Sequence, residues 1–401
     1  MVLILYRFRW VFCQLQELGR SKSTRPKSVK AALLALPETL DETYERMLIS
    51  ISEDDRPYAL TLLRWLAYAT SPPSLGQLTE ASVIDPTDDP AAEGVVDIDN
   101  KGGWGDALEI LAGLVITEGA DEQEEMTNGL ARLDVSDDGK QETGAVKLDG
   151  RAGEHTRVRL APFSVKEYLE STRILSGNAK ESFFDPTKEH GFLTQSCLVY
   201  LTYYSNCSWK TSTTKDLGKF PLLEYAAESW GHHASLQKCD STTRESTLLY
   251  SNAVKRDWLL VHDPDDLYYG PFSRRRLEDE GDGLYYASQL GLEAVVRMLM
   301  EAGADVNAQG GEYGNALQAA SYQGHKVVVR MLMEAGADVN AQAGEHGNAL
   351  QAASSRGHKM VVRTLMEAGA DVNAEGKNPP TPVYVMSTLA NRRNADRANG
   401  C

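Results

Sequence analysis

A hexapeptide of sequence GADVNA occurs three times, beginning at Gly303, Gly336 and Gly369, so this part of the chain repeats every 33 residues. A second shared segment, GNALQAA, begins at Gly314 and again at Gly347 with the same spacing. Repeats of this length are stacks of short helical units, because one unit cannot bury its apolar face alone. The period therefore predicts a stack whose extended surface is suited to binding rather than to catalysis.

The overall charge argues against two classes of partner. The 401-residue chain carries 41 basic and 57 acidic residues, which gives a formal net charge of -16. Phosphate backbones and anionic membranes would be repelled at long range, so we expect neither nucleic acid nor a membrane as partner. Two short basic clusters, residues 20–30 and 274–276, are typical of solvated surface.

The cysteines and the first residues predict a cytoplasmic location. The five cysteines are scattered without a C-x-x-C pair, so neither a disulfide framework nor a zinc site is expected. The apolar start, residues 1–6, is too short for a signal peptide or a membrane span.

Several start signals predict that the first half of the chain is mainly helical. Pro37 and Pro57 stand where the first turn of a helix could lie, and apolar residues follow each of them at helical spacing. Ser74 and Ser164 are each followed three residues later by Gln or Glu, the capping-box pattern that opens a helix.

Two short segments of alternating apolar and polar residues, 114–117 and 156–160, predict the strands of a hairpin. The residues that connect them, 118–155, are acidic and poor in large apolar groups, so we expect a disordered insert. Three helices followed by two strands is the order of elements in a winged helix.

Four segments together resemble the region that follows the NTPase core in fungal NACHT–ankyrin proteins, which are similar to intracellular immune receptors of animals and plants. They are FRWVFCQLQEL (8–18), LPETLDETYERML (36–48), LRWLAYA (63–69) and LAPFSVKEYL (160–169). A further segment, LLEYAAESWGHH (222–233), resembles the helical connector of that family.

The resemblance implies a mainly α protein in which a winged-helix-like domain and a helical connector precede an ankyrin-repeat α-solenoid. It implies five regions: a helical remnant of the segment after the NACHT core (1–53), the winged-helix-like domain with its acidic insert (54–175), the connector (176–270), three ankyrin repeats (277–379), and a partial fourth repeat with a tail (380–401).

Two features depart from the family pattern. No G-x-x-x-x-G-K-[ST] loop occurs, so nothing in the sequence would hold nucleotide phosphates. The family usually has a histidine where Pro162 stands. The chain is thus interpreted as a truncated relative, a fragment from a mispredicted gene, or a protein adapted to work without NTP.

The 33-residue units resemble ankyrin repeats, and each residue type has a physical role in that fold. Small residues such as the alanine pair 319–320 let neighbouring inner helices approach, while Val329 and similar residues fill the core between repeats. Gly303 is expected to end an outer helix with a positive φ. Asn315 and Asn348 replace the threonine of the family and are expected to cap the inner helices.

The C-terminal end of the stack is expected to be incompletely capped. Residues 380–384 lie in register 33 residues after 347–351, which indicates a partial fourth repeat. The polar tail, 391–400, cannot supply a second helix, so the outer helix near 361–366 is predicted to be partly exposed.

Two repeats can be compared directly, because residues 314–342 and 347–375 differ at only five positions. By resemblance to the ankyrin fold, three of the five lie at the end of the inner helix or at a loop tip, where ankyrin proteins contact partners. Binding of a partner and neutral drift at exposed positions explain this equally well. The five pairs are Tyr322/Ser355, Gln323/Arg356, Val327/Met360, Met331/Thr364 and Gln342/Glu375.

We predict a protein-binding site on the concave face of the repeats, in which Tyr322 and Arg356 are the anchors because both residue types are common in binding hot spots. The ten predicted site residues are Gln289, Gln309, Glu312, Tyr322, Gln323, Gln342, Glu345, Ser355, Arg356 and Glu375.

The resulting functional interpretation is a non-enzymatic interaction protein related to fungal signalling or non-self recognition, with a protein partner that includes a full-length NACHT relative as one candidate. The alternative is a fragment of a NACHT NTPase receptor whose nucleotide-binding half is missing. No catalytic, cofactor-binding or metal-binding residues are predicted, since hydrolase and paired-cysteine motifs are absent. The pair at 232–233 favours packing over metal binding, and the winged helix favours packing over DNA binding.

Overall fold

The computed structural model describes residues 25, 27, 30, 34, 36–86, 94–117, 153–161, 163–237, 243–265, 270–272 and 280–372. The predicted insert lies almost wholly outside them, as do Pro162, the tail at 380–401 and the first 24 residues. The described part is mainly helical, which confirms the predicted fold class. The chain forms two compact units, 1–85 with 96–193, and 86–95 with 194–401.

The first unit contains helices, one hairpin and short elements around a core that includes Trp65, Leu62 and Leu169, all fully buried. Its helices are α3 (Leu40–Ile49), α4 (Arg56–Tyr68), α5 (Leu75–Ala81), α6 (Trp104–Ile110) and α8 (Phe163–Leu169), with strands β3 (Val115–Thr117) and β4 (Val158–Leu160). The shorter elements are β1 (Ile84–Asp85), β2 (Val95–Val96), η1 (Ile98–Asn100), η2 (Thr172–Ser176) and η3 (Lys180–Ser182).

Capping boxes begin two helices of this unit, α3 and α5, and two of the predicted helix starts differ from the structure. Ser74 caps α5 with Gln77, as predicted. The predicted start at Pro37 is wrong, because a capping box between Thr39 and Glu42 satisfies the first backbone donors and begins α3 at Leu40. The predicted cap at Ser164 is also wrong, because α8 already includes this residue.

The predicted hairpin is confirmed by the pairing of β3 with β4. The two strands are antiparallel, with Val115 opposite Leu160 and Thr117 opposite Val158. The description of this region as a winged helix remains a prediction.

The second unit begins within α9 and contains the connector helices. These are α9 (Pro186–Asn206), α10 (Lys215–Lys219), α11 (Leu223–Leu236), α12 (Thr243–Tyr250) and α13 (Asn252–Val261). Trp230 and Trp258 pack edge to face with ring centroids 5.3 Å apart, and the Trp258 indole donates to the Ala227 carbonyl at 2.9 Å. A packing or capping role was predicted for the pair at 232–233. His233 is buried, with its Nε2 2.9 Å from the Tyr225 hydroxyl, whereas His232 is exposed.

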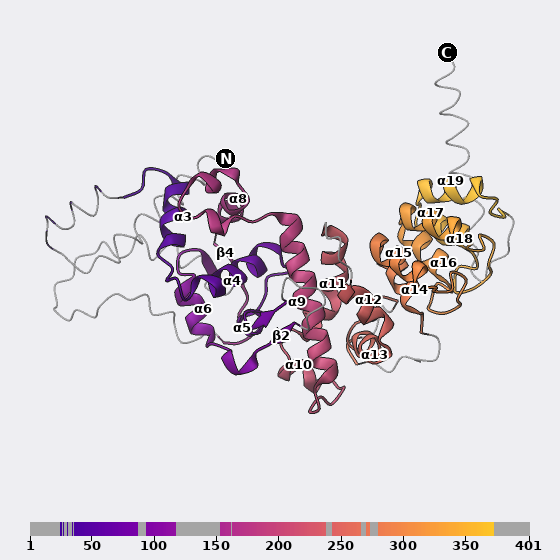
Figure 1. The fold of residues 1–401 in the computed structure, drawn as a ribbon, viewed down its shortest axis with the longest axis horizontal. Coiled ribbons are helices and arrows are strands. Elements are labelled where there is room, and N and C mark those ends of the chain that lie inside the picture. Colours follow the sequence, from indigo (N-terminus) through magenta and orange to yellow (C-terminus); the bar gives the residue numbers. More distant parts are fainter. Residues whose placement is uncertain are drawn as a thin grey trace, which may run out of the picture. The chain divides into compact units, whose positions relative to one another are not determined.

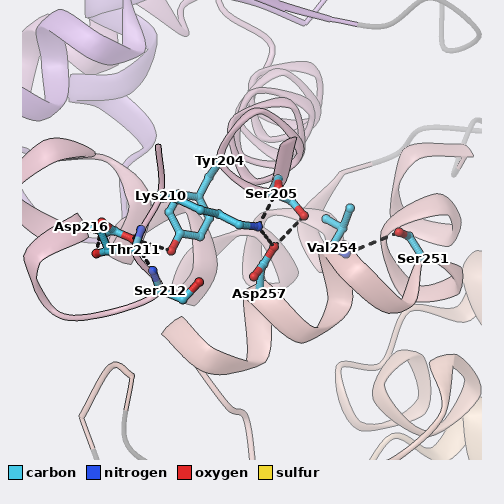
Figure 2. Close-up of polar contacts among 9 residues, drawn as sticks. All are labelled: Tyr204, Ser205, Lys210, Thr211, Ser212, Asp216, Ser251, Val254 and Asp257. Atoms are coloured by element: carbon cyan, nitrogen blue, oxygen red, sulfur yellow. Dashed lines mark hydrogen bonds and ion pairs between the residues drawn. The ribbon is translucent and has the colours of Figure 1, made fainter. Parts of the chain in front are cut away.

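A polar network holds the loop between α9 and α10 to the rest of the connector, as Figure 2 shows. Lys210 on this loop donates to Asp257 on α13 and to the carbonyl of Ser205, while the Ser205 hydroxyl also donates to Asp257 at 2.6 Å. Asp216 accepts from the Tyr204 hydroxyl at 3.0 Å and from backbone and side-chain groups of the loop. Burial alone would raise the pKa of Asp216, but these hydrogen bonds lower it.

The repeat region is a two-layer stack of helices, drawn orange to yellow in Figure 1. The inner row contains α14 (Gly283–Gln289), α16 (Ala316–Gln323) and α18 (Ala349–Ser355), which pack on one another in that order. The outer row contains α15 (Glu293–Glu301), α17 (Lys326–Glu334) and α19 (Lys359–Glu367).

The predicted roles of repeat residues are confirmed where they are described. Ala319 on the inner helix α16 and Val329 on the outer helix α17 are both fully buried. Gly303 has φ +89°. Asn315 caps α16 and Asn348 caps α18, each accepting from the backbone N–H three residues on, at 2.9 and 2.8 Å.

The last outer helix, which was predicted to be partly exposed over residues 361–366, has both buried and exposed positions. Val361 and Leu365 on α19 are buried, because they face inward toward α17 and α18 rather than toward the end of the stack. Met360, which points to the outer surface, is 54% exposed.

Adjacent repeats are also joined by a repeated hydrogen-bond pattern. The Asn307 amide donates to the Gly336 carbonyl at 3.2 Å and accepts from the Asp338 N–H at 2.8 Å. Asn340 makes the same two contacts one repeat later, with Gly369 and Asp371. Each repeat is thus fixed to the next by the same residue type in the same register.

Candidate functional site

Three aromatic rings meet on the inner side of the second and third repeats. Tyr322, at the C-terminal end of α16, stacks on Tyr313 from the loop before this helix, with ring centroids 4.3 Å apart and planes at 27°. Side chains on a helix lean toward its N-terminus, which lets the Tyr322 ring reach back toward that loop. His346, from the equivalent loop of the next repeat, stacks on Tyr322 at 4.9 Å.

The guanidinium of Arg356 completes this group, which we call the aromatic–arginine cluster (Tyr313, Tyr322, His346 and Arg356). Its Cζ lies 4.4 Å from the centroid of the Tyr322 ring, a cation–π geometry. Within the described part of the chain the guanidinium has no hydrogen bond and no ion pair. Its N–H donors therefore remain available to a ligand.

The electrostatics of the cluster are consistent with a neutral imidazole beside the guanidinium. Burial lowers the pKa of His346; the carboxylate of Glu345 opposes this shift and the charge of Arg356 adds to it. Burial and the neighbouring Tyr322 raise the pKa of Tyr313. Near pH 7 the stack therefore carries one positive charge, on Arg356.

The backbone that carries Tyr322 is fixed by the following repeat. The Nε2 of His358 donates to the Tyr322 carbonyl at 2.9 Å, which requires a proton on Nε2. Gly324 ends α16 with φ +84°, and a Cβ at this position would lie 2.6 Å from the His358 ring. Glycine is therefore needed both for the backbone conformation and for the approach of the imidazole.

The predicted site residues divide into accessible, buried and undescribed positions. Tyr322 and Arg356, the two predicted anchors, are brought into contact. The loops of Glu312 and Glu345 are joined by a backbone hydrogen bond of 3.1 Å. Six of the predicted residues are exposed, two are half-buried, and Glu375 lies outside the described residues. The exposed six are Gln309, Gln323, Gln342, Glu345, Ser355 and Arg356, and the half-buried two are Glu312 and Tyr322.

The inclusion of Gln289 in the accessible face is corrected by its burial. Gln289 is only 3% exposed, and its Nε2 donates to Asp265 at 2.8 Å. Asp265, itself buried, also accepts from the Tyr285 hydroxyl at 2.7 Å and from the Glu312 N–H at 3.0 Å. The chain segment that ends the connector therefore covers this part of the first repeat.

A second position of the first repeat is covered in the same way. Leu290 lies against α11 of the connector, where a Cβ on Gly231 would approach its side chain to 3.0 Å. By the 33-residue period, Gln289 corresponds to Tyr322, and Leu290 corresponds to Gln323 and Arg356. Gln289 and Leu290 thus pack against the connector in the first repeat, whereas the equivalent residues of the second and third repeats are accessible.

Sequence comparison of the repeats missed Tyr313 and His346. They occupy one further differing position, which lies just before the compared segments begin. Extending the comparison by a single residue would have found them. All four members of the cluster then stand at positions where the two repeats differ.

The cluster presents stacked rings and a cation rather than groups that bind metals or react with substrates. In the described ranges no group of three or more His, Cys, Asp or Glu residues could hold a metal ion. No helix in these ranges is long and apolar enough to cross a bilayer.

Comparison with known proteins identifies the repeats. Residues 284–376 match the family model for ankyrin repeats in three copies, which confirms the predicted repeat type in this region. The sequence is also similar to "Azaphilone pigments biosynthesis cluster protein L" of Monascus ruber, with 35% identity over 321 residues. The aligned part makes up 75% of this chain and 60% of that fungal protein, so the chain spans less than two thirds of its relative.

Proposed function

We propose that the protein is a non-enzymatic interaction module that binds a protein partner through the inner face of its second and third ankyrin repeats. The observation that carries this proposal is the aromatic–arginine cluster. Its residues come from two repeats that are otherwise almost identical, and they stand at three of the six positions at which these repeats differ. Residues that only maintained the stack would be the same in both copies.

The composition of the cluster supports a role in binding. Tyrosine and arginine are enriched in interface hot spots, since they bring a large contact area and several donors. Stacking holds the rings in place before a partner arrives, so less side-chain entropy is lost on association. The alternative of neutral drift does not require the differing residues to meet in one place.

The biological setting in this proposal is fungal signalling or non-self recognition, supported by the resemblance of the N-terminal segments to NACHT–ankyrin proteins and by similarity to a fungal protein. The second candidate is that the chain is part of a NACHT NTPase receptor. The genomic sequence upstream of the Met1 codon distinguishes them: an open frame with a phosphate-binding loop favours the receptor, and its absence favours a protein that works without NTP.

Affinity capture tests the proposal directly. The full chain, the double variant Tyr322→Ala/Arg356→Ala, and the control Arg330→Ala on the outer surface of α17 are each used to capture proteins from a fungal extract. We expect proteins that the wild type and the control retain and the double variant loses, with melting temperatures that stay within a few degrees. The screen includes full-length NACHT proteins and, because of the relative's name, the proteins of a biosynthesis cluster. Equal capture by all three chains would refute the proposal.

A further inference from the structure

The connector shows how a polypeptide segment occupies the inner face of an ankyrin repeat in this protein. On the first repeat, the Asp265 carboxylate contacts Gln289 and accepts a hydrogen bond from the Gln289 side-chain amide at 2.8 Å. The Tyr285 hydroxyl and the Glu312 N–H bind the same carboxylate. Asp265 is only 4% exposed, so this contact is made away from water.

The repeat period places the equivalent surface on the next two repeats, where none of the residues that the structure describes covers Tyr322 and Arg356 in the way that Asp265 covers Gln289. Tyr322 stands where Gln289 stands in the first repeat, and Arg356 stands two repeats after Leu290. Both are accessible, and no described residue forms a hydrogen bond or ion pair with the guanidinium. The inner surface thus binds the carboxylate of Asp265 on the first repeat and exposes the guanidinium of Arg356 on the third.

The guanidinium of Arg356 suits one kind of ligand group. Its Cζ lies over the Tyr322 ring at 4.4 Å from the centroid, and its N–H groups have no hydrogen-bond acceptor among the described residues. A planar fork of donors binds a carboxylate through two parallel hydrogen bonds, a contact that a lysine does not reproduce.

We propose that Arg356 and Tyr322 bind a single carboxylate side chain, Asp or Glu, of a partner protein segment that lies along the inner face as the connector lies along the first repeat. This inference rests on the proposed function and names the partner's chemistry. The Tyr322 ring, which stacks on Tyr313 and His346, holds the guanidinium in place for this contact.

Nearby charges restrict the partner segment further. Glu345 is exposed on the loop that carries His346, and Glu312 lies on the loop joined to it. Two carboxylates beside the site repel an acidic run but tolerate one acid that is flanked by neutral or basic residues. The expected ligand is therefore a mixed segment with one fixed acid, not a polyacidic tract.

Selection from a random peptide library tests the proposal on the full chain. Peptides are selected in parallel on the wild type, on Arg356→Glu and on Arg330→Glu, which makes the same charge change on the outer surface. We expect Asp or Glu at one fixed position in the wild-type peptides, Lys or Arg at that position with Arg356→Glu, and the wild-type preference with Arg330→Glu. Peptides without a fixed acid, or a preference that Arg356→Glu leaves unchanged, would overturn the inference.

A second measurement separates this inference from the proposed function. One selected peptide and its counterpart with Asn or Gln in place of the acid are compared by fluorescence anisotropy, and we expect about tenfold to hundredfold weaker binding without the carboxylate. Peptides that need Tyr322 but carry no acid would sink the inference and leave the proposed function standing. A library that yields no peptide dependent on Tyr322 or Arg356 would count against both. Thermal melts of each variant confirm that it is folded.

Discussion

Replacement of Asp265 by alanine is expected to loosen the first ankyrin repeat from the connector. The change removes the acceptor for the Tyr285 hydroxyl, the Gln289 amide and the Glu312 N–H, which lie 2.7, 2.8 and 3.0 Å from the carboxylate. Two of these donors belong to buried side chains and lose their partner away from water. The covered part of the first repeat would then carry unsatisfied polar groups.

The magnitude follows from these three contacts. A buried donor without its acceptor costs about 1–3 kcal/mol, and hydrogen bonds to a charged group lie toward the upper end of that range. Removal of the buried charge also recovers part of its desolvation cost, and Glu312 is near enough to solvent for water to replace the carboxylate. We therefore expect a net loss of about 3 kcal/mol for Asp265→Ala, and a smaller loss for Asp265→Asn, which keeps one acceptor oxygen.

Urea denaturation followed by tryptophan fluorescence measures this loss, because Trp230 and Trp258 lie in the connector and the Trp258 ring packs on Tyr286 of α14 at 5.5 Å. The control is Glu301→Ala on the exposed end of α15, which we expect to change stability by no more than about 0.5 kcal/mol. If Asp265→Ala is as stable as this control, the carboxylate does not hold the connector to the repeats.

Two further predictions concern the contacts between repeats. Gly324→Ala should lower the melting temperature more than Gly336→Ala, although φ is positive at both sites, because only the first places a Cβ against His358 while the second meets open space; equal shifts would contradict the assigned clash. Burial lowers the pKa of His325, so the neutral imidazole stabilises the fold above about pH 6.5 and this contribution is lost as the pH falls through the lowered folded value. His325→Gln should therefore reduce the loss of stability between about pH 6.5 and pH 5 in parallel melts, and an unchanged pH profile would exclude His325 as a source.

The parts of the fold that depend on local rules could be predicted from the sequence. The period of 33 residues fixes which residues of each repeat are equivalent, so the small residue at Ala319, the core residue at Val329 and the positive φ at Gly303 follow from one unit. The hairpin of β3 and β4 was predictable because strand alternation is also a local signal. The start of α3 was not, because Pro37 and Thr39 are both acceptable starts and the capping box decides between them.

The candidate site was predictable only in part, because it is built from contacts that no single repeat contains. Differences between repeats pointed to Tyr322 and Arg356, and these do meet. The stacking of Tyr313 and His346 on Tyr322 depends on how two repeats pack, which the linear pattern does not state. Gln289 looked equivalent to Tyr322, but the connector buries it, and that contact joins segments from different parts of the chain.

The identical contacts of Asn307 and Asn340 mean that the stack has the same joint between each pair of neighbours. If a copy of the second repeat were inserted after it, the copy could make the same contacts with both of its neighbours. The contact between the connector and the first repeat would not change. The inner face of this protein can thus be lengthened by a whole unit without a new kind of contact between repeats.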